Sequence, residues 1–261
     1  AMPGALRLQL RTWMSRFFSG ADGRMLTMKD LSLPFLVVVT GVRREAAERA
    51  RRLEQLVERE IKQSTRGRLL HLKDLSTNLV RFLRELVSTP GGLEPIVLGP
   101  YDETAEFDVL DAAGFSSALP GVIQYDITRN DPRMQELMRA TLERHDVSFL
   151  ADGGIASNVP VRATWEAVQR GQLGSRNVMI LGLDCFAPQL NRNMVFLPLM
   201  RIAAENVARD RPFAHYIFTY RRTLSPTALV PSKRALNHAI SSGRREFSRQ
   251  LPFIQKMLEP V

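Results

Sequence analysis

The chain has 261 residues, of which 44% are hydrophobic and 24% charged, and its 36 Lys and Arg against 27 Asp and Glu give a formal net charge of +9. This composition excludes a disordered chain, a collagen and a coiled coil, and the length suffices for a single large domain, residues 1–261, with a buried core. The single cysteine, Cys185, excludes an internal disulfide and a multi-cysteine zinc site. No apolar run approaches roughly 18 residues and no signal peptide is recognisable, so we expect a cytoplasmic or peripheral membrane protein.

The first predicted element is an amphipathic helix over residues 5–18. The apolar residues that share one side of it are Leu6, Leu10, Trp13, Met14 and Phe17. Such a helix either packs on its own domain, which is the interpretation we favour, or lies on a lipid surface. Residues 33–40 then form a continuous apolar run rich in β-branched residues. That run predicts a strand buried on both faces, and therefore a parallel one.

A helical excursion is predicted over residues 43–92. Residues 43–62 hold seven basic and five acidic side chains, and residues 74–87 repeat leucine and phenylalanine at helical spacing. Because the two signs of charge are interspersed, the first helix is typical of a solvated face and not of a nucleic-acid surface. We therefore expect no nucleic-acid partner, and nucleic-acid binding is a third alternative that rests on the net charge alone.

Short elements follow the excursion. Residues 95–98 are a short apolar run, and residues 106–113 predict a short helix that ends at Gly114. Asp131 and Pro132 predict the start of a longer helix that continues to about Arg144, because aspartate caps helices and proline suits the first helical position.

The next stretch predicts a strand, a turn, a helix and a second strand. The ranges are 147–151, 152–154, 160–170 and 177–183. This order is typical of a βαβ unit with parallel strands and a right-handed crossover. The predicted fold class is therefore α/β, with a mainly parallel central sheet flanked by helices. Beyond it we expect a helix over 199–210, a strand over 214–220 and a basic helical region over 232–258, interrupted near Gly243 and Pro252.

Asp152 is the leading candidate for chemistry, because reactive groups gather outside the carboxyl ends of strands in α/β sheets. It follows a predicted strand and precedes Gly153 and Gly154, which permit close backbone approaches. A carboxylate in that position acts as a general base, or orients one, when a nucleophile lies within hydrogen-bond reach. The alternative is an aspartate that only caps a turn.

No other residue type forms a recognisable site. The histidines, His71, His145, His215 and His238, are scattered and match no metal-binding motif, so we expect surface or packing roles and no metal. Cys185 has no neighbouring base, and we interpret it as a packed thiol. Gly114 to Ala118 resembles a Gly-x-Ser-x-Gly nucleophile elbow only loosely, because the preceding residues are helical and not a strand. We therefore do not expect Ser116 or Ser117 to be a nucleophile.

Three segments together carry a family resemblance. Ala113-Gly-Phe-Ser-Ser-Ala-Leu-Pro-Gly121 resembles the Ala-Ser-x-Ala-x-Pro-Gly motif of patatin-like phospholipases. Asp152-Gly-Gly-Ile-Ala-Ser-Asn-Val-Pro160 is similar to that family's Asp-Gly-Gly followed by Asn-x-Pro, and Leu26 to Phe35 is similar to its entry into the preceding strand. The three occur in family order over roughly residues 20 to 185.

The resemblance implies a lipid acyl hydrolase that uses a Ser-Asp dyad without a metal, a histidine or a cofactor, and a lipid or membrane-surface substrate. Asp152 would be the base that activates the serine, with Gly153 and Gly154 shaping its turn. Ser116 and Pro120 would belong to a structural segment near the active site. Asn158 and Pro160 would position the loop and begin the following helix.

The sequence departs from the family pattern in its first part. Residues 1–32 contain neither the glycine-rich oxyanion loop nor the Gly-x-Ser-x-Gly nucleophile, and the chain is either the carboxyl-terminal part of a longer patatin-like protein, which we favour, or a degenerate relative. We expect the 261 residues alone to be catalytically inactive and to expose a sheet edge through which chains associate. The alternative function is a non-catalytic lipid-binding or regulatory module derived from the same fold.

Overall fold

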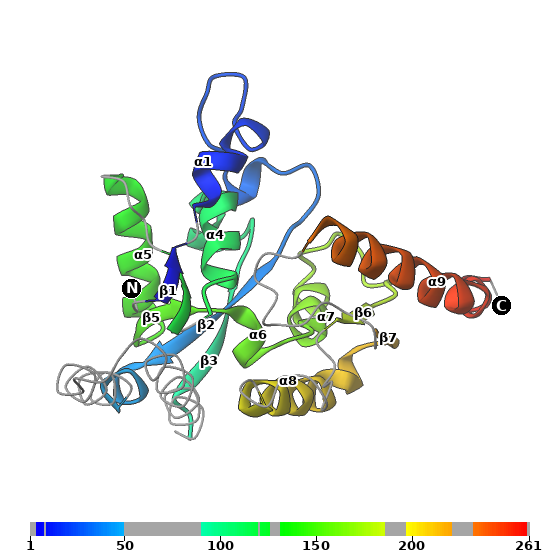
Figure 1. Cartoon of the computed structure of the whole chain (residues 1–261). Helices are drawn as coiled ribbons and strands as arrows, with labels where there is room; N and C mark the ends of the chain where they lie inside the picture. Colours follow the sequence, from blue (N-terminus) through cyan, green and yellow to red (C-terminus); the bar gives the residue numbers. More distant parts are fainter. Residues whose placement is uncertain are drawn as a thin grey trace.

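The computed structural model describes residues 4–7, 9–49, 90–119, 121–125, 131–185, 197–220 and 232–259 (Figure 1). Most of the predicted excursion, including the helix expected over residues 74–87, lies outside this part of the chain, as do Pro120 and His71. In the described part of the chain, the predicted excursion is helical at residues 44–49.

The central sheet is antiparallel. It contains β3 (Leu93–Leu98), β2 (Val37–Arg43) and β5 (Val147–Ala151), in that order, and β2 pairs antiparallel with both neighbours. The expectation that β2 is parallel is therefore wrong, and so is that of a mainly parallel central sheet. The apolar run arises because both faces of β2 are covered, which is independent of the direction of its neighbours.

The two faces of β2 belong to different parts of the core. Val39 packs in a cluster with Phe107 and Met134, whereas Val42 packs with Ile155 and Met200. Alternate residues of a strand point to opposite faces, so one strand contributes to both clusters. In sequence order, the largest fully buried side chains are Met28, Val39, Thr40, Val42, Ile96, Leu98, Phe107, Met134, Val168 and Phe218.

Parallel pairing occurs outside the central sheet. β6 (Leu181–Asp184) pairs parallel with β7 (Tyr216–Thr219), and α8 (Leu197–Asp210) lies between them in sequence. The predicted βαβ unit is therefore wrong in its pairing: β5 pairs antiparallel with β2, and β6 pairs with β7 and not with β5. The architecture is a mixed α/β one, with helices against a small antiparallel sheet and separate parallel strand pairs.

The N-terminal segment differs from the predicted helix. Its first residues form β1 (Gly4–Arg7), which pairs parallel with β4 (Gly121–Gln124). The helical part is short, α1 (Leu10–Met14) followed by the 3-10 turn η1 (Ser15–Phe17). A further 3-10 turn, η2 (Met28–Asp30), precedes β2.

The middle of the chain supplies helices that cover the central sheet. They are α4 (Val109–Ser116) and α5 (Pro132–Arg144), and the 3-10 turn η3 (Asp102–Glu106) precedes them. α4 passes through Gly114, where we expected a helix to end. The start of α5 is confirmed, since the Asp131 carboxylate accepts a hydrogen bond from the Met134 backbone N–H at 3.2 Å.

The C-terminal part ends in one long helix. After α6 (Gly153–Ala156), α7 (Val161–Gln169), α8 and η5 (Arg211–Phe213), α9 (Lys233–Leu258) continues without a break through Gly243 and Pro252. Pro252 has no backbone N–H, so the carbonyl of Ser248 lacks its helical hydrogen-bond donor. Both residues are exposed, and water can bind that carbonyl instead. None of the described helices is long and apolar enough to cross a membrane.

Candidate active site

Asp152 lies directly after β5 and caps the short helix α6. Its Oδ1 accepts a hydrogen bond from the Gly154 backbone N–H at 2.8 Å, and its own N–H donates to the Ala118 carbonyl at 2.9 Å. The predicted tight turn is therefore the first turn of a helix, and the aspartate is its N-cap. The capping bond uses one carboxylate oxygen.

The turn after Asp152 is held tightly against β2. A Cβ atom added to Gly153 would lie 2.0 Å from the Val38 carbonyl oxygen, so only glycine fits there. The Ser116 hydroxyl donates to the same carbonyl at 2.8 Å. The Thr40 hydroxyl donates to the Asp152 carbonyl at 2.6 Å and accepts from the Ala156 N–H at 3.1 Å.

Burial raises the pKa of Asp152 to about 6, against an ordinary value of 3.8, while the hydrogen bond from Gly154 opposes that rise. The side chain is partly buried and forms no ion pair with any residue in the described ranges. The carboxyl group can therefore exchange a proton near neutral pH.

The loop that follows connects α6 to α7 and contacts the end of β6. The Asn158 amide donates to the Asp184 carboxylate at 3.3 Å, and Pro160 caps α7. The loop returns toward the turn, because the Asn158 side-chain oxygen would lie only 3.5 Å from a Cβ atom added to Gly154. The structure thus brings Asp152, Gly153, Gly154, Ser116 and Asn158 together around one turn.

The family model described as patatin-like phospholipase matches residues 6–165. The chain belongs to this family. No curated protein and no solved structure gives a significant match to it. The matched patatin-like segment contains β2, the end of α4 and the whole Asp152 turn, and it ends within α7. Membership places the chain among the lipid acyl hydrolases at the level of the family.

Three side chains at the end of α8 complete the patatin-like turn from outside the matched segment. The Asn206 amide donates to the Ile155 carbonyl at 2.7 Å, and the Arg209 guanidinium donates to the Ala156 carbonyl at 3.0 Å. Asp210 accepts from the Ser157 hydroxyl at 3.1 Å. Carbonyls at a helix C-terminus need such partners. Sequence reasoning missed these residues, because roughly fifty positions separate them from the turn and no local motif marks them.

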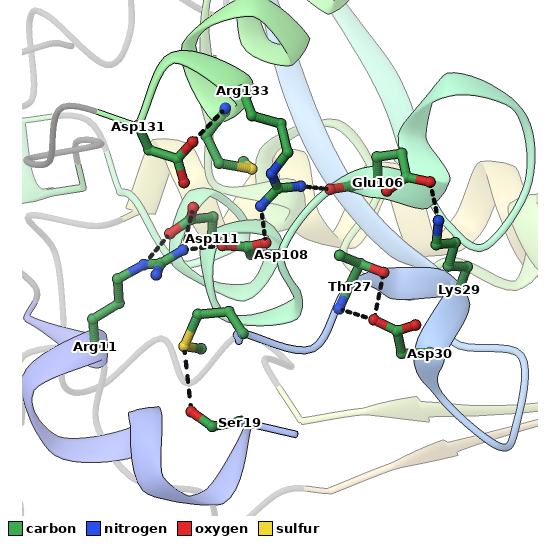
Figure 2. A network of polar contacts seen from close by, with 12 residues as sticks. Arg11, Ser19, Thr27, Lys29, Asp30, Glu106, Asp108, Asp111, Asp131 and Arg133 are labelled. Atoms are coloured by element: carbon green, nitrogen blue, oxygen red, sulfur yellow. Dashed lines mark hydrogen bonds and ion pairs between the residues drawn. The ribbon is translucent and has the colours of Figure 1, made fainter. Parts of the chain in front are cut away.

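A second polar network lies away from this turn and fastens the N-terminal segment to α4 (Figure 2). Arg11 pairs with the carboxylates of Asp108 and Asp111, both of which are buried, and Arg133 pairs with Asp108 at 2.5 Å. Burial raises the pKa of Asp108, which the two guanidinium groups oppose. The Asp111 carboxylate accepts from the Tyr125 hydroxyl at 2.5 Å. Because its charges are paired with one another, we interpret this network as one that stabilises the fold.

The remaining candidates take other roles. His145 pairs with Glu94 at 3.0 Å, and His215 Nδ1 lies 3.1 Å from the Ile180 backbone N–H, which donates to it. No group of three possible metal ligands occurs in the described part of the chain. Cys185 is exposed, so its interpretation as a packed thiol is wrong. Cys185 continues the alternation of β6, in which Leu181 and Leu183 are exposed and Asp184 is buried.

Proposed function

We propose that Asp152 is the general base of a Ser-Asp dyad in a lipid acyl hydrolase. The observation that carries this proposal is the carboxyl group at the end of β5, held by a turn in which Gly153 lies against the Val38 carbonyl. A pKa near 6 leaves the group mostly ionised at neutral pH and still basic enough to accept a proton.

The proposed chemistry moves one proton through Asp152. When a serine hydroxyl lies within hydrogen-bond reach, the carboxylate takes its proton while the serine oxygen bonds to the ester carbonyl carbon. The protonated carboxyl then returns the proton to the departing alcohol. Water repeats the same exchange and releases the fatty acid. Gly153 and Gly154 shape the turn, and Asn158 and Pro160 position the loop behind it.

In this proposal the serine is not one of these 261 residues, which contain no Gly-x-Ser-x-Gly segment. Ser116 is a poor nucleophile, because its hydroxyl donates its proton to the Val38 carbonyl. Ser117 likewise donates to the Ala113 carbonyl at 2.9 Å. A dyad without its nucleophile loses most of its rate enhancement, so we expect these residues alone to be inactive.

Two measurements test the proposal. The 261-residue chain, treated with a serine-directed fluorophosphonate and analysed by mass spectrometry, should remain unlabelled and should not hydrolyse a p-nitrophenyl ester. Labelling of Ser116 would refute the assignment. In a protein that joins these residues to a Gly-x-Ser-x-Gly segment, D152N should lower kcat by about 10²- to 10⁴-fold with little change in KM. Wild-type turnover in that variant would exclude Asp152 as the base.

A non-catalytic lipid-binding module is a second candidate, favoured by exposed aromatic side chains on α1 and η1. Trp13 is 75% exposed and Phe17 61% exposed, and the Arg16 guanidinium lies 4.6 Å from the centre of the Phe17 ring. Aromatic and basic residues in this arrangement suit a lipid interface. Flotation with liposomes should recover the wild-type chain and lose the W13S/F17S variant. Absence of binding to both anionic and neutral liposomes would exclude this function.

A further inference from the structure

Three arginines from two separate elements line one hollow beside β7. Arg211 comes from η5, and Arg245 and Arg249 come from adjacent turns of α9, four residues apart on one side of the helix. The hollow has a volume of about 690 Å³. It lies outside the segment that the family model matches.

The walls of the hollow are fixed by contacts between β7 and α9. The Tyr216 hydroxyl donates to the Gln250 side-chain oxygen at 2.6 Å, and the ring of Tyr216 packs on that of Phe253 with centres 5.3 Å apart. Arg245 donates to the hydroxyl of Ser242, which is buried, at 3.1 Å. The two contacts of Tyr216 hold α9 against the strand, so the hollow is built by packed elements.

The charge of the hollow is not balanced within the described part of the chain. Glu246 is the one acidic residue among those that line it, against three arginines. None of the three arginines forms an ion pair with a described residue, whereas Arg11, Arg133 and Arg209 elsewhere are each paired with aspartates. Like charges that line one hollow repel one another, and an anion that binds there relieves the repulsion.

We propose that this hollow binds a phosphate group. Guanidinium groups form paired, charge-assisted hydrogen bonds to phosphate oxygens, and Thr219 brings a hydroxyl group to the same walls. The phosphate belongs either to a lipid headgroup or to free phosphate in solution. The proposal does not depend on the role of Asp152, since binding here requires no catalysis.

The test compares two double variants that change the net charge equally, together with the single variant R211Q. R245Q/R249Q and R211Q remove arginines of the hollow, and R234Q/R244Q removes two exposed arginines of the same helix that do not line it. Calorimetry with inorganic phosphate and with soluble dihexanoyl phosphatidic acid should show binding to the wild-type chain. Each lost arginine of the hollow should weaken that binding by about tenfold, and R234Q/R244Q should bind as the wild type does.

The outcomes separate the possible explanations. Tighter binding of phosphatidic acid than of inorganic phosphate identifies a lipid headgroup as the ligand, and equal affinity identifies phosphate itself. Equal weakening by both double variants would show a general effect of charge and overturn the site, as would absence of binding to either probe. Circular dichroism of each variant verifies that the helix is retained. In the protein that joins these residues to a Gly-x-Ser-x-Gly segment, loss of ester hydrolysis in D152N with unchanged phosphate binding would leave this inference intact.

Discussion

Replacement of Asp152 by asparagine should stabilise the fold at neutral pH. The pKa of this carboxyl group rises from 3.8 to about 6 on folding, so the folded state disfavours the charged form. A raised pKa contributes stability that is complete below about pH 4 and is lost as the pH rises through 6. Each pKa unit corresponds to about 1.4 kcal/mol, and the charged carboxylate therefore costs about 3 kcal/mol at pH 8.

Asparagine keeps the side-chain oxygen that accepts from the Gly154 N–H, so the capping bond survives while the charge is removed. Urea unfolding of the wild-type chain and D152N should therefore coincide near pH 3.5. At pH 8 the midpoint of D152N should be higher by about 1 M, given the usual dependence of stability on urea. Carbon-13 NMR of the Asp152 carboxyl group should show a titration midpoint near 6.

The control is D22N, for which the expected change in stability at neutral pH has the opposite sign. The Arg24 side chain lowers the pKa of Asp22, which is exposed, so this substitution should slightly destabilise the fold at neutral pH and have no effect at low pH. If D152N is no more stable than the wild type at pH 8, or if the carboxyl group titrates near 4, then Asp152 is solvated and the reasoning about its burial is wrong.

Other substitutions test the packing around the site. G153A should destabilise the chain by about 3 kcal/mol in urea unfolding, because its Cβ would overlap the Val38 carbonyl, whereas G243A, on an open part of α9, should stabilise it by about 0.5–1 kcal/mol. A G153A variant as stable as the wild type would disprove the close approach. R11M should lower the free energy of unfolding by about 3 kcal/mol in thermal unfolding, because it removes a guanidinium partner of buried carboxylates. A change smaller than the experimental error would mean that the ion pair of Arg11 and Asp111 is solvated. N206A should cost about 1–3 kcal/mol and speed hydrogen exchange in the turn after Asp152, and unchanged exchange there would contradict the capping role.

Local signals in the sequence were sufficient for several elements and for the main candidate residue. Asp131 and Pro132 predicted the start of α5, because a cap and a proline act within one turn of the chain. The apolar run before Asp152 predicted β5, and the two glycines after it indicated a close backbone approach. The family motifs led to the same turn, and the family match includes it.

Tertiary structure decided the features that depend on distant partners. Residues 5–7 have a helical apolar pattern but form part of β1, because β4 supplies their hydrogen bonds. The direction of β2 was not readable either, since burial on both faces gives the same apolar run in either orientation. The end of α8 reaches the Asp152 turn, and Arg211 reaches the arginines of α9, only through folding. Caps and turns involve neighbouring residues and so appear in the sequence, whereas strand pairing and converging charges require segments that the sequence keeps far apart.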